Sequence, residues 1–359
     1  MTASQPVRTL IVDDSALVRK LLTHLLDSHP RISVVGTAID AQDARAKIKQ
    51  LNPDVLTLDI EMPGMDGLNF LGKIMTLRPM PVIMVSTLTS KGADASLEAM
   101  RLGAFDVFPK PRTNLSRELD SYRGELQEKV LAAAHANVRV LADRAKRHLG
   151  QTQTTRVLED APIAANSALQ PLVAIGASTG GTEAIALCME RLPANMPGIV
   201  ITQHIPGAFS ESFARRLNDC SALNVTEARH GDRILAGHAY VAPGDQHLEV
   251  VRDGAHFVCR LNQGEPVNRH RPSVDVMFDS VARCARNLVV GVLLTGMGKD
   301  GAQGLLDIRQ AGGRTIAQDE ESSVVWGMPG SAVKLGAAES IMPIDHVAPQ
   351  ILTCLRSLA

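Results

Sequence analysis

Aromatic residues, excess charge and long apolar runs are all scarce in this sequence of 359 residues. Aromatic side chains make up 3% of the chain and the formal net charge is -1, which leaves little for base stacking or for a phosphate-binding surface. No apolar run approaches the roughly 20 residues of a membrane helix, and the N-terminus lacks the pattern of a signal peptide. We therefore expect no nucleic-acid partner and no direct membrane insertion.

Paired cysteines and metal-ligand spacings are missing as well. The five cysteines are an odd number and show no C-x-x-C spacing, so we expect reduced thiols in a cytoplasmic protein. The histidines between His230 and His256 recur every eight or nine residues, which is not a helical ligand spacing. A structural zinc site is therefore not expected.

The chain is long enough for two or three domains, and its pattern indicates two. Short β-rich runs alternate with helix-length segments over residues 7–125 and again over residues 169–359. The intervening residues 126–168 are first helical in composition and then polar and alanine-rich, as in a linker. The fold class predicted is α/β, with two doubly wound parallel-sheet domains joined by a helical and flexible linker.

Charged and hydroxyl residues follow the predicted strands of the first domain. Asp13 and Asp14 come after the first strand, Asp59 after the third, Ser86 after the fourth and Lys110 after the fifth. Strand ends of a parallel sheet converge on one edge, and three carboxylates there would need a cation such as Mg²⁺. One carboxylate could then attack a phosphoryl donor, with the hydroxyl and ammonium holding the transferred oxygens.

The strings IVDDS, LDIEMPGMDG, VSTLT and FPKP resemble the signatures of a response-regulator receiver domain, which has a flavodoxin-like fold. The resemblance implies phosphorylation of Asp59 by a histidine kinase. It also implies Mg²⁺ held by Asp13, Asp14 and Asp59, and switch roles for Ser86 and Lys110. The chain would then belong to a two-component phosphorelay.

The second domain begins with VAIGASTGG, residues 173–181, where an apolar run ends in small residues around Ser178. Gly176, Ser178 and Gly180 satisfy the G-x-S-x-G pattern of a nucleophile elbow between a strand and a helix. A glycine-rich strand-to-helix turn could equally cradle a phosphate, and small residues also suit an ordinary tight turn. This stretch alone leaves the three interpretations open.

Two further strand ends favour the nucleophile. His204 closes a predicted strand, and Asp300 follows the buried run NLVVGVLLT. An imidazole can take the proton of Ser178, and a carboxylate can orient the imidazole. Backbone N–H groups near Thr179 and in the turn of residues 296–298 could form an oxyanion hole.

A competing motif lies in the same loop. Gly296, Gly298 and Gly301 spell G-x-G-x-x-G after a strand, and Asp319 has the spacing of a ribose-binding acid, so a dinucleotide enzyme is the alternative. Asp300 counts against it, because a carboxylate would repel the pyrophosphate. Too few residues also follow Gly301 for a second mononucleotide-binding half.

Taken together, AIGASTGG, TQHIP, RPSVD and TGMGKDG resemble the catalytic domain of the bacterial chemotaxis protein-glutamate methylesterases, in which a receiver is fused to a Rossmann-like serine hydrolase. The resemblance implies Ser178, His204 and Asp300 as the triad and an oxyanion N–H from Met297, beside that of Thr179. It implies hydrolysis of glutamate methyl esters, and deamidation of glutamines, on helices of methyl-accepting chemoreceptors. No cofactor is expected for the ester chemistry.

The pairing of a switch with an esterase suggests regulation. We expect the unphosphorylated receiver to limit access to the catalytic site, and phosphorylation of Asp59 to shift the population toward an open form. A scaffold without activity is the non-enzymatic alternative, and it would retain its effect without Ser178.

Overall fold

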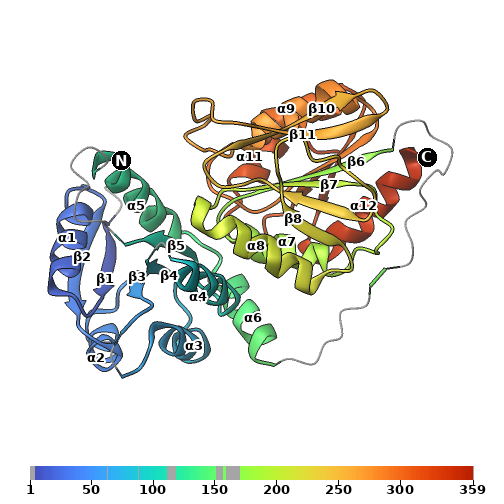
Figure 1. Ribbon diagram of the computed structural model, residues 1–359. Coiled ribbons are helices and arrows are strands. Elements are labelled where there is room, and N and C mark those ends of the chain that lie inside the picture. The colour runs from blue at the N-terminus through green and yellow to red at the C-terminus, as the bar shows by residue number, and fades with distance from the viewer. Residues whose placement is uncertain are drawn as a thin grey trace. The chain divides into compact units, whose positions relative to one another are not determined.

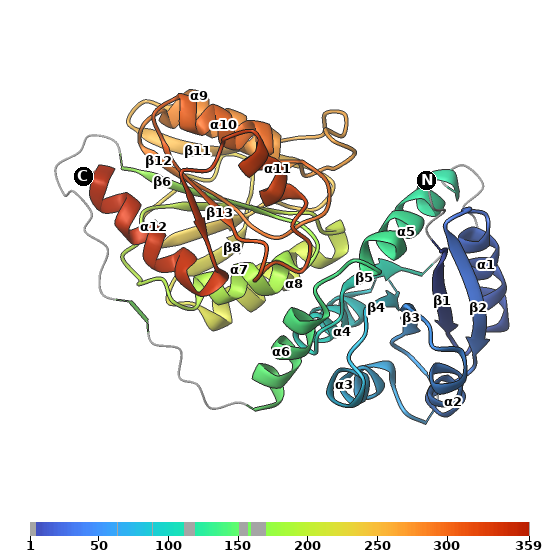
Figure 2. The same ribbon diagram turned by 180° about the vertical axis from the view of Figure 1, so that it is seen from behind.

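The computed structural model describes residues 5–62, 64–87, 89–110, 119–150, 157–158 and 170–358. They form two compact units that divide near residue 152 (Figures 1 and 2). Residues 151–156 and 159–168 of the predicted linker lie outside this description. None of the helices in the described ranges combines the length and apolar character needed to cross a membrane. All five cysteines are free thiols, as expected.

The first unit is a five-stranded parallel sheet in the order β2-β1-β3-β4-β5. Helices α1 and α5 lie on one face and α2, α3 and α4 on the other (Figure 1). Side chains of Ser15, Asp40, Asp66 and Thr89 cap the first four helices by accepting a backbone N–H of the first turn. The elements are β1 (Val7–Val12), α1 (Ala16–Asp27), β2 (Ile32–Ala38), α2 (Ala41–Leu51), β3 (Val55–Asp59), α3 (Gly67–Leu77), β4 (Val82–Ser86), α4 (Ser90–Arg101), β5 (Asp106–Pro109), α5 (Leu119–Ala133) and α6 (Val138–Leu149).

Helices α5 and α6 belong to this first unit, although the sequence predicts a linker from residue 126 onward. Leu126 and Val130 of α5 are fully buried, and the Tyr122 hydroxyl donates to the Pro109 carbonyl at 2.7 Å. Helix α6 packs on α3 and α4, with Leu141 fully buried. These buried leucine and valine side chains fix both helices on the receiver-like unit.

The second unit is a seven-stranded parallel sheet in the order β14-β13-β12-β6-β7-β9-β8. Helices α7, α8 and α12 cover one face, and α9 and α10 the other (Figures 1 and 2). Its elements are β6 (Leu172–Ala177), α7 (Gly181–Met189), β7 (Ile199–Gln203), α8 (Gly207–Cys220), β8 (Asn224–Glu227), β9 (His238–Val241), β10 (His247–Asp253), β11 (His256–Asn262), α9 (Val274–Ala285), β12 (Val289–Leu293), α10 (Ala302–Gln310), β13 (Arg314–Gln318), α11 (Met328–Lys334), β14 (Ser340–Met342) and α12 (Ile344–Leu358).

One strand assignment from the sequence is wrong. From the sequence, the run HAYV of residues 238–241 is expected to form a β-rich insert with the two strands that follow it, but it forms β9 within the main sheet, paired with β7 and β8. Its Ala239, Tyr240 and Val241 are all buried, as expected for a strand covered on both faces. Only β10 and β11 form the separate antiparallel hairpin.

The order of the strands determines where a site can form. Strand β6 lies between β7 and β12. The chain runs from β6 to its neighbour β7 on one side, and the later strand β12 pairs with β6 on the other side, so the strand order reverses at β6. The carboxyl ends of parallel strands open a crevice at such a reversal, where ligands of α/β proteins usually bind. Ser178, His204 and Asp300 follow these three adjacent strands.

The assignment of α6 to the first unit can be tested with Leu141→Ala. Because Leu141 is fully buried, the substitution should destabilise this unit by about 2–5 kcal/mol. Hydrogen–deuterium exchange of α3 and α4 peptides in the full chain would measure the loss. Leu149→Ala is the control, since Leu149 of the same helix is 60% exposed and its loss should cost less than about 0.5 kcal/mol. Unchanged exchange in Leu141→Ala would show that α6 does not support the unit.

Candidate active site

Ser178 lies at a sharp corner between β6 and α7 that only small residues permit. A Cβ on Gly296 would lie 2.8 Å from Ser178 Cβ, so the loop after β12 approaches the serine as closely as a glycine allows. Gly180 caps α7 in the left-handed region, at φ 74°. The corner therefore has the strand–turn–helix context that the G-x-S-x-G pattern requires.

The structure brings Ser178, His204 and Asp300 into one hydrogen-bonded series. Ser178 Oγ lies 3.0 Å from His204 Nδ1, and His204 Nε2 lies 2.8 Å from Asp300 Oδ2. The side chains of His204 and Asp300 are 7% and 2% exposed, so water has little access to their contact. The imidazole presents Nδ1 to the serine and Nε2 to the carboxylate, the reverse of the trypsin-like arrangement.

The carboxylate of Asp300 is surrounded by donors from the N-terminus of α9 and from the loop before this helix. Its Oδ2 accepts the Val274 N–H at 2.6 Å, and its Oδ1 accepts the Ser273 hydroxyl and the Asn268 amide, each at 2.8 Å. Burial opposes ionisation, but the hydrogen bond and charge of His204, together with these donors, outweigh it. They hold the pKa of Asp300 well below its usual value. Asp300 is thus a stable anion, suited to orienting an imidazole.

A second carboxylate completes a reciprocal arrangement. Asp300 precedes α10 and binds N–H groups of the first turn of α9, while Asp275 of α9 accepts the Gly304 N–H of α10 at 2.8 Å. The Asn268 amide bridges the two carboxylates, 2.7 Å from Asp275 Oδ2. Burial, together with the charge of Asp300, raises the pKa of Asp275. Each helix N-terminus is therefore capped by an acid of the neighbouring segment.

The predicted oxyanion residues lie next to Ser178. The N–H of Ser178 itself donates to the Thr295 carbonyl at 3.0 Å, so it is already used. The following residue, Thr179, is fixed through its carbonyl, which accepts the Thr295 hydroxyl at 3.1 Å. Met297 comes directly after Gly296, the residue that packs against Ser178. Both peptide groups are thus held at the serine corner.

Several contacts of this site have no counterpart in the sequence prediction. The Gln203 amide donates to the carbonyls of Ser178 and His204, at 2.9 and 3.1 Å, and so ties two strand ends together. Asn268 and Ser273 were also missed, although Ser273 belongs to the RPSVD string. Asp319, the acid of the dinucleotide alternative, instead accepts the N–H and hydroxyl of Ser322 in a local turn.

The acids of the first unit also converge. Asp13, Asp14 and Asp59 offer carboxylate oxygens within 4.8 Å of one another, the one such group of potential metal ligands in the described ranges. Lys110 Nζ lies 2.7 Å from Asp59 Oδ2 and 3.7 Å from Asp13 Oδ2. The buried Asp13 Oδ2 has no hydrogen-bond partner among the residues described here. Carboxylate oxygens in this setting suit Mg²⁺.

Electrostatics at this acidic cluster differ from those around Asp300. Burial raises the pKa of Asp59 to about 6, because the hydrogen bond from Lys110 offsets the loss of hydration only in part and Asp13 adds repulsion. Ser86 lies nearby at the end of β4, but its hydroxyl points to the carbonyls of Thr87 and Gly92, at 3.4 and 3.3 Å. The structure thus joins Lys110 to Asp59 and gives Ser86 other partners.

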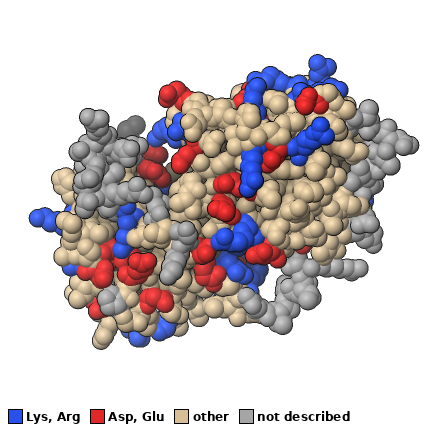
Figure 3. All heavy atoms as spheres, viewed as in Figure 1, with Lys and Arg blue, Asp and Glu red and all other residues tan. Residues whose placement is uncertain are grey.

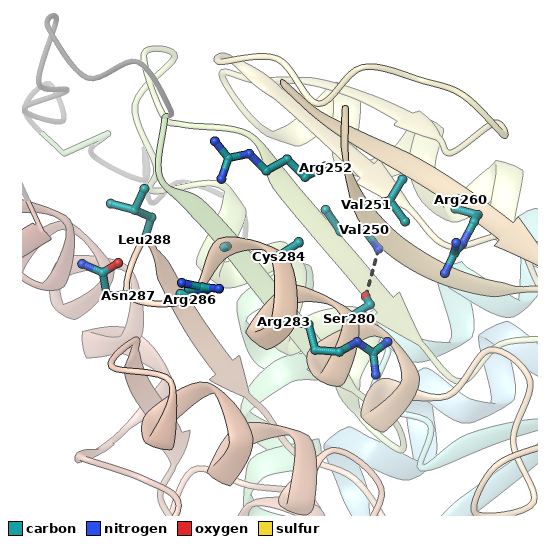
Figure 4. Close-up of a pocket in the computed structure, with 11 residues that line it drawn as sticks. Val250, Val251, Arg252, Arg260, Ser280, Arg283, Cys284, Arg286, Asn287 and Leu288 are labelled. Atoms are coloured by element: carbon teal, nitrogen blue, oxygen red, sulfur yellow. Dashed lines mark hydrogen bonds between the residues drawn. The ribbon is translucent and has the colours of Figure 1, made fainter. Parts of the chain in front are cut away.

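A pocket of about 530 Å³ lies elsewhere on the second unit, between β10, β11 and the end of α9 (Figure 4). Four arginines line it, but Arg260 already pairs with Glu249 and Arg283 with Asp279. None of the predicted site residues lines this pocket. Basic and acidic side chains both occur across the face shown in Figure 3, in keeping with the net charge of -1.

Comparisons with known proteins agree with the resemblances. Family models match residues 173–351 as CheB methylesterase and residues 9–119 as response regulator receiver domain. The protein-glutamate methylesterase/protein-glutamine glutaminase 1 of Xanthomonas euvesicatoria pv. vesicatoria (strain 85-10) is 53% identical over 98% of each chain. The protein-glutamate methylesterase/protein-glutamine glutaminase 2 of Pseudomonas aeruginosa is 52% identical, over 97% of this chain and 96% of that relative. The crystal structure of the Thermotoga maritima CheB methylesterase catalytic domain is 37% identical, covering 51% of this chain and 98% of that one, with a TM-score of 0.50. The fold class and both resemblances are confirmed.

The raised pKa of Asp59 predicts how stability changes with pH. A carboxyl whose pKa rises on folding favours the folded state at low pH and loses that contribution as pH rises through about 4 to 6. In EDTA at pH 7.5, Asp59→Asn should therefore stabilise the first unit, by on the order of 3 kcal/mol. The gain should vanish near pH 4.

Hydrogen–deuterium exchange of β3 and β4 peptides, compared between variants at each pH, would measure this gain. Asp66→Asn is the matched control, because Asp66 is an exposed cap residue that asparagine can replace. A gain of the same size at both pH values, or none at pH 7.5, would contradict the prediction.

Proposed function

Because this chain belongs to the CheB methylesterase family and carries a response-regulator receiver domain, we propose that it hydrolyses glutamate methyl esters on methyl-accepting chemoreceptors. By the same chemistry it deamidates specific receptor glutamines, which provides adaptation in bacterial chemotaxis. The observation that carries the proposal is the hydrogen-bonded series from Ser178 through His204 to Asp300. Its place of action is the cytoplasm, where the receptor helices are reached without crossing a membrane.

Acylation begins at Ser178. As its Oγ attacks the ester carbonyl, His204 Nδ1, 3.0 Å away, takes the hydroxyl proton. Asp300 keeps the Nε2–H tautomer in place and stabilises the imidazolium that forms. The N–H groups of Thr179 and Met297 hold the negative oxygen of the tetrahedral intermediate, and each such donor is worth about 10² to 10³ in rate.

The leaving group distinguishes the two activities. The imidazolium of His204 returns its proton to the departing methoxide, which gives methanol and a glutamyl ester on Ser178. With a glutamine side chain the group that leaves is ammonia. Water, deprotonated by His204, then attacks the acyl carbon and releases glutamate and the free serine. No step requires a cofactor.

The receiver supplies regulation through Asp59, which accepts a phosphoryl group from a histidine kinase of the chemotaxis system. Mg²⁺ held by Asp13, Asp14 and Asp59 would neutralise the phosphoryl oxygens when bound. The buried Asp13 Oδ2 atom, which has no hydrogen-bond partner among the described residues, supports the proposal that a cation binds here. Lys110, already 2.7 Å from Asp59, can follow the charge to the phosphoryl group, and Ser86 can turn toward it.

Phosphorylation then controls the esterase. We assign residues 7–125 to the receiver and 169–359 to the catalytic domain. Residues 126–168 connect them, and the helical first part of this connection, which includes α6, packs on the receiver-like unit. The unphosphorylated receiver limits access to Ser178, and phosphorylation of Asp59 shifts the population toward an open form.

Methanol release from methylated chemoreceptor membranes tests the esterase. Ser178→Ala should lower release by a factor of about 10⁶, to background, because the nucleophile is gone. Ser221→Ala removes a hydroxyl that donates to the Leu223 carbonyl at 3.5 Å, after the end of α8, and should leave the rate unchanged. Turnover by Ser178→Ala at the native rate would refute the assignment of Ser178 as the nucleophile.

The same assay tests regulation. Acetyl phosphate with Mg²⁺ should increase methanol release by the native chain and should not affect Asp59→Asn, which cannot be phosphorylated. A chain starting at Leu169 should be more active than the unphosphorylated full-length chain. If this shorter chain is no faster, the receiver does not restrain the catalytic domain.

A further inference from the structure

A tight turn over residues 267–270 lies beside the triad. Val267 and His270 exchange two backbone hydrogen bonds, of 3.1 and 2.9 Å. The two residues between them, Asn268 and Arg269, both have positive φ angles, 52° and 69°, as in a type I′ turn. A left-handed conformation is unfavourable for arginine, and such backbone strain persists where surrounding contacts hold it in place.

Side-chain contacts anchor the turn on both sides. On one side, the Asn268 amide reaches the carboxylates of Asp275 and Asp300. On the other, Arg271 donates to the carbonyls of Gln263 and Gly264, at 3.2 and 3.0 Å. These contacts hold the backbone of the turn from which the His270 side chain extends, and those of Asn268 also hold the triad carboxylate.

The His270 ring stacks on the ring of His204. Their centroids are 3.6 Å apart and their planes differ by 13°, which is face-to-face van der Waals contact. His270 is half-buried, whereas His204 is almost fully covered. His270 thus forms part of the wall over one face of the imidazole, and it closes that face to water and to rotation of the ring.

We propose that His270 is a positioning residue for the esterase reaction, which keeps His204 Nδ1 directed at Ser178 and supports the imidazolium by ring stacking. The inference rests on the proposed function, because it assumes that Ser178 is the nucleophile. Removing the ring would free one face of His204, and the imidazole could turn away from its 3.0 Å contact with Ser178. A flat aromatic ring of similar size would preserve this restraint, and its π-face would still attract the imidazolium.

The test measures the reactivity of Ser178 without a receptor. A small fluorophosphonate phosphonylates an activated serine, with loss of fluoride, and the second-order rate reports how well His204 takes the serine proton. His270→Ala should react about tenfold more slowly than the native chain, and His270→Phe within about threefold of it. His256→Ala, an exposed histidine of the same unit, is the matched control and should react at the native rate.

Methanol release provides the second measurement. His270→Ala should lower kcat by about tenfold with little change in KM, and His270→Phe should restore kcat. Fluorescence of the single tryptophan, Trp326 in the second unit, verifies folding of each variant. A purely structural role would lower the amount of folded protein and leave the rate per labelled Ser178 unchanged.

The outcomes separate this inference from the proposed function. Native rates in His270→Ala, or a loss in His270→Phe as large as in His270→Ala, would refute the stacking role. A rise in KM alone would assign His270 to substrate binding instead and would also refute it. If the native chain itself is not labelled on Ser178, the proposed function fails, and this inference fails with it.

Discussion

The second unit depends on keeping one buried carboxylate ionised. Asp300 is almost completely removed from water, and an unpaired carboxylate there would be protonated. Its charge persists because the first turn of α9, the Ser273 hydroxyl, the Asn268 amide and His204 all donate to it. The same donors fix its position, since each constrains one direction around the carboxylate. This arrangement determines the orientation of His204, and therefore which ring nitrogen faces Ser178.

In the first unit, by contrast, burial raises the pKa of the central carboxyl group, Asp59. Asp59 is as buried as Asp300, but its cationic partner Lys110 is shared with Asp13, and its pKa is raised to about 6. An acidic cluster left incompletely neutralised is suited to taking up a cation and a phosphoryl group, both of which relieve the repulsion. The hydrogen-bonded carboxylate of Asp300 thus suits the proposed orienting of a base, and the incompletely neutralised cluster around Asp59 suits the proposed phosphorylation switch.

Residues at strand ends could be predicted from the sequence because topology brings them together. A parallel sheet places Ser178, His204 and Asp300 on one edge whenever their strands are neighbours, and residue type then indicates the chemistry. Asn268 and Gln203 could not be predicted in this way, since a polar residue in a loop or at a strand end has no periodicity that marks its partner. The stacking of His270 likewise depends on a turn whose left-handed residues are an asparagine and an arginine rather than glycines. The docking of α6 was missed because its apolar stripe resembles that of any surface helix.

If Asp300 fixes the tautomer of His204, the proton lies on Nε2 and Nδ1 is free to accept from Ser178. Nitrogen-15 NMR of the histidine-labelled chain, at a pH where this ring is neutral, distinguishes the two tautomers. We expect a His204 signal with a protonated Nε2 and an unprotonated Nδ1, and a mixture of tautomers after Asp300→Ala. A neutral ring that carries its proton on Nδ1 in the native chain would refute this role of Asp300, because Nδ1 could not then act as the base for Ser178.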